Sequence, residues 1–476
     1  MFSNLKKVST ILAAAMMLTS SIAIASPNHA NHNPIFQKDW KFIASIKAKV
    51  FKPVFEKLHH LEIDIAGVNK KTNEIDVLIN DYDYKNLVKE GIELKIREVK
   101  GISKGPDEEY RNPEEIEQLT LDFANKFPNL TKRISIGKSV EGRDIWAVKI
   151  SDNADIDESS EPAVLFNSMH HAREVMGPEV AIDIMETLLS GYGNDTQITK
   201  WVDSYEIWVM PMFNVDGNNK MWTKDKWWRK NNQGGYGVDL NRNYPSGWNK
   251  CNGSSGWRSS QTYRGPDPAS EPETQAMMNF IANVRPVFDI SYHSYSELVI
   301  YPFGCSPERT PTQEVVEKIG KEIGKKLNYT AGTAWELLYN ADGGDIDWMY
   351  DAYQVIPFVI ELNSNKEGFQ PSYAKWRDKT VIKNRAGWQH LLTRLEESGV
   401  RGQFTMNKAI VSDFKVEILN SGQTESFQSY VGHKTGMYHL VLNPGDYDLH
   451  FVVADKIIAK ERISIGAKLQ TLDISL

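Results

Sequence analysis

Short apolar runs alternate with amphipathic stretches through the middle of the chain. The runs at residues 163–166, 207–210, 287–290 and 358–361 have the length and composition of buried strands, and the stretches between them carry apolar residues at helical spacing. One helix is expected to begin at the capping-box pattern Ser270-Glu271-Pro272-Glu273, and another to cover residues 380–397. This alternation predicts an α/β domain over residues 108–398, in which helices flank a mixed, mostly parallel sheet.

The two flanking regions show other patterns. Between residues 41 and 100 the apolar positions follow the order strand, helix, strand, strand, helix, strand, which matches a small ferredoxin-like α/β unit. Residues 402–476 alternate apolar and polar positions between turns, as at Asn443-Pro444-Gly445, which predicts a small β-sandwich. The stretch from Ser103 to Glu109 is polar and reads as an exposed linker where a protease can cut. Residues 26–107 are thus expected to form a linker and an N-terminal domain.

The first 25 residues have the features of a secretory signal peptide. Lys6 and Lys7 precede a short apolar run, and Ala23-Ile24-Ala25 suits signal peptidase, which favours a cleaved signal over a membrane helix. No later stretch is apolar for long enough to span a bilayer. The protein is therefore expected to be secreted or periplasmic, with no membrane association after cleavage.

The net charge bears on the possible partners of the protein, and the two cysteines bear on whether it contains a disulfide. The net charge is −7 and the chain has no long basic block, which argues against nucleic acid as a partner. The two cysteines, Cys251 and Cys305, are able to pair in an exported protein, but their spacing leaves the pairing open.

The central region carries a pattern typical of a catalytic zinc site. His171 and Glu174 lie three residues apart just beyond the apolar run at 163–166, and His293 follows the run at 287–290. Imidazole and carboxylate are ligand types that zinc accepts, and a catalytic zinc takes three of them and keeps one position open. Open α/β sheets place such sites beyond the carboxyl ends of their strands. Glu361 ends another apolar run, where partial burial would raise its pKa toward that of a general base.

With these residues, the segments Trp227–Lys230, Val238–Asn243 and Leu338–Trp348 resemble those of the zinc metallocarboxypeptidases, carboxypeptidase A and its bacterial relatives. The resemblance covers roughly residues 108–398 and implies the carboxypeptidase fold. It implies one zinc ion held by His171, Glu174 and His293, with Asp239 orienting His171. It also implies that Glu361 is the general base and that Arg229 polarises the substrate carbonyl. His170 has the wrong spacing and is expected to be a spectator.

The same resemblance implies a set of substrate-binding residues. Asn241, Arg242 and Tyr339 would hold the terminal carboxylate, and Arg173 would line the outer subsites. Tyr295 and Phe369 match further substrate-side aromatics, and Gly343-Gly344 would be a flexible joint in the segment that closes over substrate. The side-chain pocket would be lined by Ile300, Gly304, Ala334, Leu338, Ala341, Ile346 and Val359. These residues predict an apolar or aromatic preference, or a broad one if Asp342 or Asp345 reaches in.

The implied function is a secreted zinc exopeptidase that removes residues from peptide or protein C-termini. The N-terminal domain resembles the family's propeptide, which covers the active-site cleft until an activating protease cuts it off; the alternative is a permanent accessory domain. The C-terminal sandwich resembles transthyretin-like domains and has no expected chemistry. Two other functions stay open: an amidase of the same fold acting on cell-wall peptides or acylated amino acids, and a non-catalytic binding protein.

Overall fold

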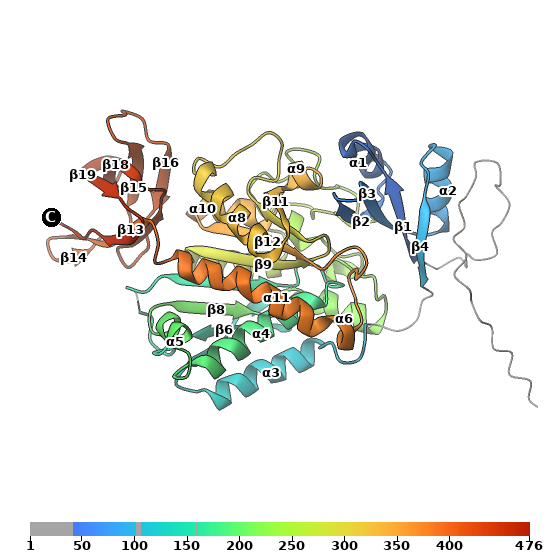
Figure 1. Ribbon diagram of the computed structural model, residues 1–476, viewed down its shortest axis with the longest axis horizontal. Coiled ribbons are helices and arrows are strands. Elements are labelled where there is room, and N and C mark those ends of the chain that lie inside the picture. The colour runs from blue at the N-terminus through green and yellow to red at the C-terminus, as the bar shows by residue number, and fades with distance from the viewer. Residues whose placement is uncertain (1–40, 101–105, 159) are drawn as a thin grey trace, which may run out of the picture.

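The structure, a computed structural model, describes residues 41–100, 106–158 and 160–476. The expected signal peptide and residues 26–40 lie outside the described residues. The small N-terminal unit and the C-terminal sandwich occupy opposite ends of a large central domain (Figure 1). None of the described helices has the length and apolar character needed to cross a membrane.

The N-terminal unit has the expected ferredoxin-like arrangement. Its sheet has the order β2-β3-β1-β4, with two helices on one face. Phe42 and Val77 of the sheet pack against Phe55 and Leu58 of α1 and Leu87 of α2 in a core of their own. The elements are β1 (Lys41–Lys47), α1 (Phe51–His60), β2 (Asp64–Asn69), β3 (Glu74–Ile79), α2 (Asp81–Lys89) and β4 (Lys95–Lys100).

The central domain is built on an eight-stranded mixed sheet, which confirms the predicted fold class. The strand order is β11-β10-β12-β9-β7-β8-β6-β5, and β8, β7, β9 and β12 run parallel to one another. The strands β7 and β9 are buried along their whole length, which explains the apolar character of residues 163–166 and, apart from the buried Asp289, of residues 287–290. The strands are β5 (Thr131–Lys138), β6 (Asp144–Ile150), β7 (Ala163–Ser168), β8 (Glu206–Met210), β9 (Phe288–Ser294), β10 (Leu298–Tyr301), β11 (Thr330–Thr333) and β12 (Ile356–Leu362).

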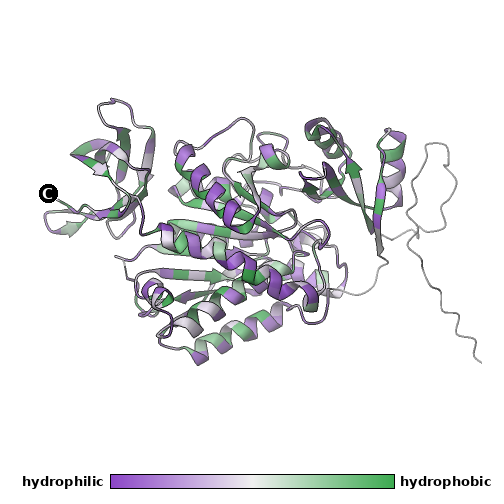
Figure 2. Ribbon diagram, in the orientation of Figure 1, coloured by the Kyte–Doolittle hydropathy of each residue, from purple (hydrophilic) through white to green (hydrophobic). Residues whose placement is uncertain are grey.

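Helices cover both faces of this sheet, and Figure 2 shows them with apolar and polar residues interspersed, as helices that bury one face require. They are α3 (Pro113–Lys126), α4 (Met176–Gly191), α5 (Thr196–Val202), α6 (Val215–Thr223), α7 (Pro272–Val284), α8 (Gln313–Leu327), α9 (Ala334–Leu337), α10 (Asp345–Tyr353) and α11 (Tyr373–Arg394), with short 3₁₀ turns η1 (Gln233–Gly235) and η2 (Leu240–Arg242).

Two helix starts differ from the prediction. The capping box at residue 270 is wrong: Glu271 is the N-cap of α7 without a side-chain cap, and the Ser270 hydroxyl donates to the Glu271 carboxylate instead. Glu273 accepts a hydrogen bond from Val140 in the β5–β6 turn, so it is not free to cap. Helix α11 begins at Tyr373, earlier than the expected residue 380, and its first amide donates to the Asp107 carboxylate at 2.8 Å.

The C-terminal region forms the predicted sandwich of two sheets. One contains β14-β13-β17 with β20 and β21 beside β13, and the other has the order β16-β15-β18-β19. Phe404, Phe414, Leu449 and Phe451 pack between them. The strands are β13 (Gly399–Met406), β14 (Ala409–Ile410), β15 (Lys415–Asn420), β16 (Gln428–Val431), β17 (Met437–Val441), β18 (Gly445–Val453), β19 (Lys456–Ile465), β20 (Leu469–Thr471) and β21 (Ile474–Ser475).

Candidate active site

The parallel strands bring four of the predicted residues to one edge of the sheet. His171 and Glu174 lie in the turn that follows β7, where the Glu174 amide donates to the His171 carbonyl at 3.2 Å. His293 lies near the end of β9, the neighbour of β7. Glu361 pairs directly with His293 across the parallel strands β12 and β9. The carboxyl ends of three adjacent strands therefore converge on one point.

His171, Glu174 and His293 have the geometry of a three-ligand metal site. The two Nδ1 atoms are 3.0 Å apart, and the Glu174 carboxylate oxygens lie 2.9 Å from His171 Nδ1 and 3.1 Å from His293 Nδ1. Tetrahedral ligands at zinc bond lengths are separated by about 3.3 Å, so these atoms need to move only a few tenths of an ångström. All three side chains are buried, and the donor set fits zinc.

The far nitrogen of each imidazole has a hydrogen-bond partner. His171 Nε2 lies 3.2 Å from Asp239 Oδ1, and His293 Nε2 lies 3.2 Å from the Ser291 hydroxyl. These contacts orient the rings and leave both Nδ1 atoms for the metal. Burial alone would raise the pKa of Asp239, but the charge of Arg229 and then His171 hold it well below its ordinary value.

Electrostatics inside the site separate the roles of its two glutamates. Burial opposes ionisation of Glu174, but the adjacent imidazoles of His171 and His293 lower its pKa, as a ligand requires. Burial, and then the negative charge of Glu174, raise the pKa of Glu361 above its ordinary value. Glu361 lines the same cavity as the three ligands, which suits a group that accepts and returns a proton.

The predicted carbonyl-polarising residue Arg229 and two predicted carboxylate-binding residues, Asn241 and Arg242, also line this cavity. Arg229 is fixed by two hydrogen bonds from Nε and Nη2 to Asp239 Oδ2, at 3.1 and 2.9 Å. The Arg242 guanidinium donates to the carbonyls of Gly253 and Asn241, at 3.0 and 2.6 Å, which sets its plane. Fixed guanidinium groups beside a cavity are well suited to bind a carboxylate.

The side-chain pocket contains all the predicted wall residues, including Ile346 at 7% exposure. Its acidic residues differ in part from those expected. Asp342 does not line the pocket, because its carboxylate accepts hydrogen bonds from the Cys251 and Gly253 amides. Asp345 and Asp347 do line it, because α10 begins at Asp345 beside the cavity. Burial raises the pKa of Asp347 to about 7.

Gly343 packs tightly against Arg242, and its role as a flexible joint stays a prediction. It has a φ of +67°, and a Cβ there would lie 2.3 Å from the Arg242 carbonyl oxygen. Gly343 therefore permits close packing of the segment against Arg242.

The remaining predicted residues contact the N-terminal unit. Arg173 donates to Asp64 in β2 through two hydrogen bonds, of 2.6 and 2.9 Å, and is fully buried. The Tyr295 hydroxyl donates to Asp76 in β3 at 3.2 Å. Tyr339 contacts Phe55 of α1 edge-on, with ring centroids 5.6 Å apart. Phe369 belongs to an apolar cluster with Ile43 and Leu78 of the N-terminal unit. It also contacts the Tyr295 ring and the Arg173 guanidinium, whose carbon is 4.2 Å from the Phe369 ring centroid.

Sequence reasoning missed Asp64 and Asp76 and undervalued His170. The first two are ordinary acids on predicted strands, and only their position facing the catalytic domain distinguishes them. His170 is fully buried beneath the metal site, with Nε2 3.1 Å from the Tyr244 hydroxyl and Nδ1 3.3 Å from the Ser291 hydroxyl. His170 is not part of the group of side chains that could hold a metal ion, which consists of His171, Glu174 and His293. The geometry therefore agrees with the prediction of His171, and not His170, as a ligand.

Comparisons with known proteins agree with this geometry. A family model for zinc carboxypeptidases matches residues 116–380. Human carboxypeptidase B is 30% identical over 313 residues, which cover 63% of this chain and 73% of the relative. Human mast cell carboxypeptidase A is 32% identical over 276 residues, covering 55% of this chain and 64% of the relative, a little less than two thirds.

Solved structures show the same fold. The crystal structure of the carboxypeptidase A from Helicoverpa armigera superposes with a TM-score of 0.65 at 21% identity, over 75% of this chain and 97% of the other. The matched family model spans more than half of the present chain and includes the His-Glu-His cluster. The chain therefore belongs to the zinc carboxypeptidase family.

Proposed function

We propose that this protein is a zinc-dependent exopeptidase that hydrolyses the last peptide bond of peptides or proteins. The observation that carries the proposal is the single cavity lined by the His171-Glu174-His293 cluster, Glu361 and the two fixed arginines Arg229 and Arg242. A hydrolase needs the first two features, and recognition of a free C-terminus needs the arginines. A non-catalytic binding protein would have no need of a glutamate with a raised pKa beside the cluster.

The chain's own residues suggest a division of labour. Zinc, when bound by the cluster, supplies a Lewis acid that polarises a carbonyl and lowers the pKa of water. Glu361 accepts a proton from the attacking water and delivers it to the leaving amine nitrogen. Arg229, held by Asp239, faces the oxygen that becomes negative, a contact whose removal typically costs on the order of 10²–10³ in rate. Asn241, Arg242 and Tyr339 bind the substrate carboxylate and so select the terminal bond.

The pocket supports a preference for apolar or aromatic C-terminal residues. Ile300, Ala334, Ile346 and Val359 line it and favour an apolar side chain. A broad preference that includes lysine and arginine is the second candidate, favoured by the carboxylates of Asp345 and Asp347 in the same wall. Relative rates on peptides ending in phenylalanine or lysine separate the two preferences.

The contacts of the N-terminal unit support synthesis as an inactive precursor. Ile65, Ala66 and Gly67 of β2 line the cavity, so the unit lies directly over the candidate active site. The Arg173 guanidinium, which is assigned to substrate binding, donates its hydrogen bonds to Asp64 of this unit instead. An activating protease that cuts near residues 103–109 would allow the N-terminal unit to leave, and the cavity and Arg173 would then be accessible to substrate. The signal-like residues 1–25 support export before activation.

A peptide assay tests the function directly. The zinc-loaded full chain, before and after limited trypsin treatment, is incubated with peptides that carry a free C-terminal carboxylate, and products are followed by mass spectrometry. We expect stepwise loss of C-terminal residues, much faster after trypsin. Matched C-terminally amidated peptides should stay intact. Cleavage of cell-wall muropeptides with no cleavage of free-carboxylate peptides would overturn the proposal in favour of an amidase.

A further inference from the structure

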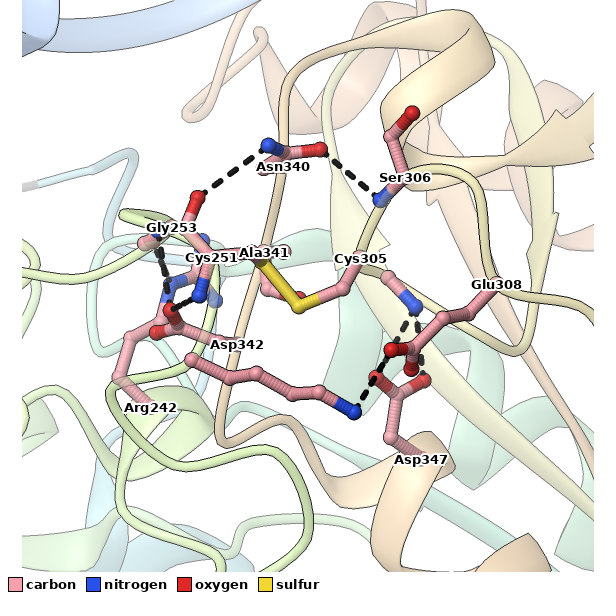
Figure 3. The surroundings of a disulfide bond; sticks show 12 residues. Arg242, Cys251, Gly253, Cys305, Ser306, Glu308, Asn340, Ala341, Asp342 and Asp347 are labelled. Atoms are coloured by element: carbon pink, nitrogen blue, oxygen red, sulfur yellow. Dashed lines mark hydrogen bonds and ion pairs between the residues drawn. A yellow bond between two sulfur atoms is a disulfide. The ribbon is translucent and has the colours of Figure 1, made fainter.

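Cys251 and Cys305 form a disulfide with an S–S distance of 2.09 Å, which answers the question that their spacing left open. The bond joins two loops beside the candidate active site (Figure 3). The first, residues 243–271, connects η2 to α7, and the second, residues 302–312, connects β10 to α8. No residue role proposed above involves this bond.

The chain segment after Tyr339 runs between these two loops and is hydrogen-bonded to both. Asp342 accepts from the amides of Cys251 and Gly253, at 2.9 and 3.0 Å. The Asn340 amide side chain donates to the Cys251 carbonyl at 3.2 Å and accepts from the Ser306 amide at 3.1 Å (Figure 3). A single side chain therefore bridges the two loops across the segment.

Close packing adds to these hydrogen bonds. A Cβ on Gly253 would lie 2.6 Å from Ala341 Cα, and a Cβ on Gly304 would lie 2.2 Å from the Ala341 carbonyl oxygen. The Ala341 amide also donates to the Gly304 carbonyl at 3.0 Å. The segment is thus held between two glycines, each within two residues of a half-cystine, and a small separation of the loops would release it.

Both loops also contact the substrate cavity. Gly304, next to Cys305, lines the side-chain pocket together with Ala341. Gly253, two residues after Cys251, accepts the hydrogen bond from Arg242 Nε. The position of the disulfide therefore affects the position of Arg242, which is assigned to the substrate carboxylate, and the position of the pocket wall.

We propose that the Cys251–Cys305 disulfide is a positioning element for substrate recognition: it holds the two loops against residues 340–342 and so fixes Arg242, Tyr339 and the pocket wall. The inference rests on the proposed exopeptidase function. Within the described chain, residues 243–271 contain no helix or strand beyond the isolated bridge of Ser255 with Tyr263. The loop is held by individual side-chain hydrogen bonds, such as those from Lys230 Nζ to the Arg258 and Ser260 carbonyls, and has no strand ladder. A cross-link between residues 54 apart therefore removes further freedom from the end of the loop that contacts residues 340–342.

The test compares three full-length proteins, each zinc-loaded and treated with trypsin in the same way. The first is wild type, and the second carries Cys251→Ser with Cys305→Ser. The third carries Lys250→Gln with Glu308→Gln, which removes a 2.6 Å ion pair that links the same two loops on their exposed side. The measurements are kcat and KM on a peptide ending in phenylalanine, the Kd for 3-phenylpropionate by calorimetry, and zinc content.

For the cysteine variant we expect KM and the Kd for 3-phenylpropionate each to rise by about tenfold or more, with a smaller change in kcat and unchanged zinc content. The Lys250/Glu308 variant should match wild type, because exposed ion pairs contribute little. Wild-type values of KM and Kd in the cysteine variant would overturn the proposal. The proposal would also be overturned if the Lys250/Glu308 variant lost as much affinity for 3-phenylpropionate as the cysteine variant.

Two further outcomes are also decisive. If the cysteine variant does not fold, folded wild type is reduced with tris(2-carboxyethyl)phosphine until mass spectrometry shows two free thiols, and an unchanged Kd for 3-phenylpropionate then overturns the proposal. If wild type binds 3-phenylpropionate but cleaves no peptide, the exopeptidase function fails. The Kd comparison still decides the role of the disulfide, because it requires no turnover.

Discussion

Asp64 of the N-terminal unit pairs with Arg173 of the catalytic domain through two parallel hydrogen bonds, of 2.6 and 2.9 Å. Arg173 lies two residues after the metal-ligand candidate His171, and its side chain is completely inaccessible to solvent. A buried guanidinium that loses its carboxylate keeps the cost of burial without the compensating charge. The pair is therefore expected to hold the N-terminal unit on the active site until proteolysis separates them.

Asp64→Ala should weaken the closed precursor. An uncompensated buried charge costs about 3–5 kcal/mol, so the N-terminal unit should detach more often and expose the cavity. We expect higher peptidase activity in the uncut chain and faster activation by trypsin. The kcat/KM of the fully cut enzyme should not change, since Asp64 has then been removed. Rates before and after trypsin measure both quantities.

Lys41→Gln is the matched control for this variant. Lys41 also joins the N-terminal unit to the catalytic domain, through a 2.9 Å ion pair with Asp225, but both side chains are 33% exposed. Exposed pairs of this kind contribute about 0–1 kcal/mol, so the uncut control should keep the low activity of wild type. Equal activation of the two variants would argue against a special role for the Asp64–Arg173 pair.

Glu361→Gln should remove turnover and leave zinc in place. The amide keeps the shape of the side chain beside His293 but cannot accept a proton, and general acid–base catalysis contributes about 10²–10⁴-fold in rate. Metal analysis should still find zinc in the variant, whereas His293→Gln should lose it. A Glu361→Gln protein that cleaves peptides at the wild-type rate would refute the assigned base.

The three metal-ligand candidates and Glu361 were predictable because each lies at or just beyond the end of a largely apolar strand whose pattern is readable. His293 and Glu361 follow runs that become the adjacent strands β9 and β12. Other features, such as an edge strand and the acidic residues of the pocket, depend on contacts between distant segments, which a local sequence pattern does not reveal. The strand β11, Thr-Ala-Gly-Thr, has no strand-like alternation and exists because it pairs with β10. Asp347 lines the pocket because of where α10 begins, and Asp342 does not because its carboxylate binds the amides of the loop after Arg242.

The contacts between the N-terminal unit and the catalytic domain could not be predicted either, because they join residues that are far apart in the sequence. Asp64 and Asp76 have the sequence context of solvent-facing strand residues, and their partners Arg173 and Tyr295 lie more than a hundred residues away. The docking of one folded surface on another decides these pairs.

Glu273 should make the protein less stable as pH rises from 4.5 toward 7. Burial raises its pKa from 4.5 to about 7, and it accepts a hydrogen bond from the Val140 amide at 3.1 Å. Between these pH values the folded state holds a proton that the unfolded state has lost, so unfolding becomes easier as pH increases. The shift corresponds to about 3 kcal/mol at neutral pH.

Glu273→Gln mimics the protonated side chain and should remove this pH dependence. The stability of the variant relative to wild type should therefore grow from pH 4.5 to 7, measured by urea denaturation of the zinc-loaded protein at each pH. Glu425→Gln, in an exposed loop of the sandwich, is the control and should follow wild type. Parallel stability curves for wild type and Glu273→Gln would show that Glu273 ionises normally.

Arg285 should determine how firmly the C-terminal sandwich is attached. It ends α7 in a left-handed conformation, with φ +48°, and its guanidinium donates to the carbonyls of Val431 and Gly432 in the sandwich, at 3.3 and 3.1 Å. The guanidinium carbon also lies 4.1 Å from the centre of the Tyr353 ring. One side chain thus connects the end of α7, the last residue of α10 and the end of β16 in the sandwich.

Arg285→Ala removes these contacts and keeps the strained backbone, whereas Arg285→Gly removes the contacts and relieves the strain, which costs about 1–2 kcal/mol for a non-glycine residue. Both variants should show an earlier unfolding transition for the sandwich in calorimetry, and the glycine variant should melt higher than the alanine variant. Lys434→Ala, which removes only an exposed 3.1 Å contact with Asn283, should leave a single wild-type transition. If Arg285→Ala also melts as wild type does, the sandwich is held by its other contacts with α10 and α11, and Arg285 serves mainly to end α7.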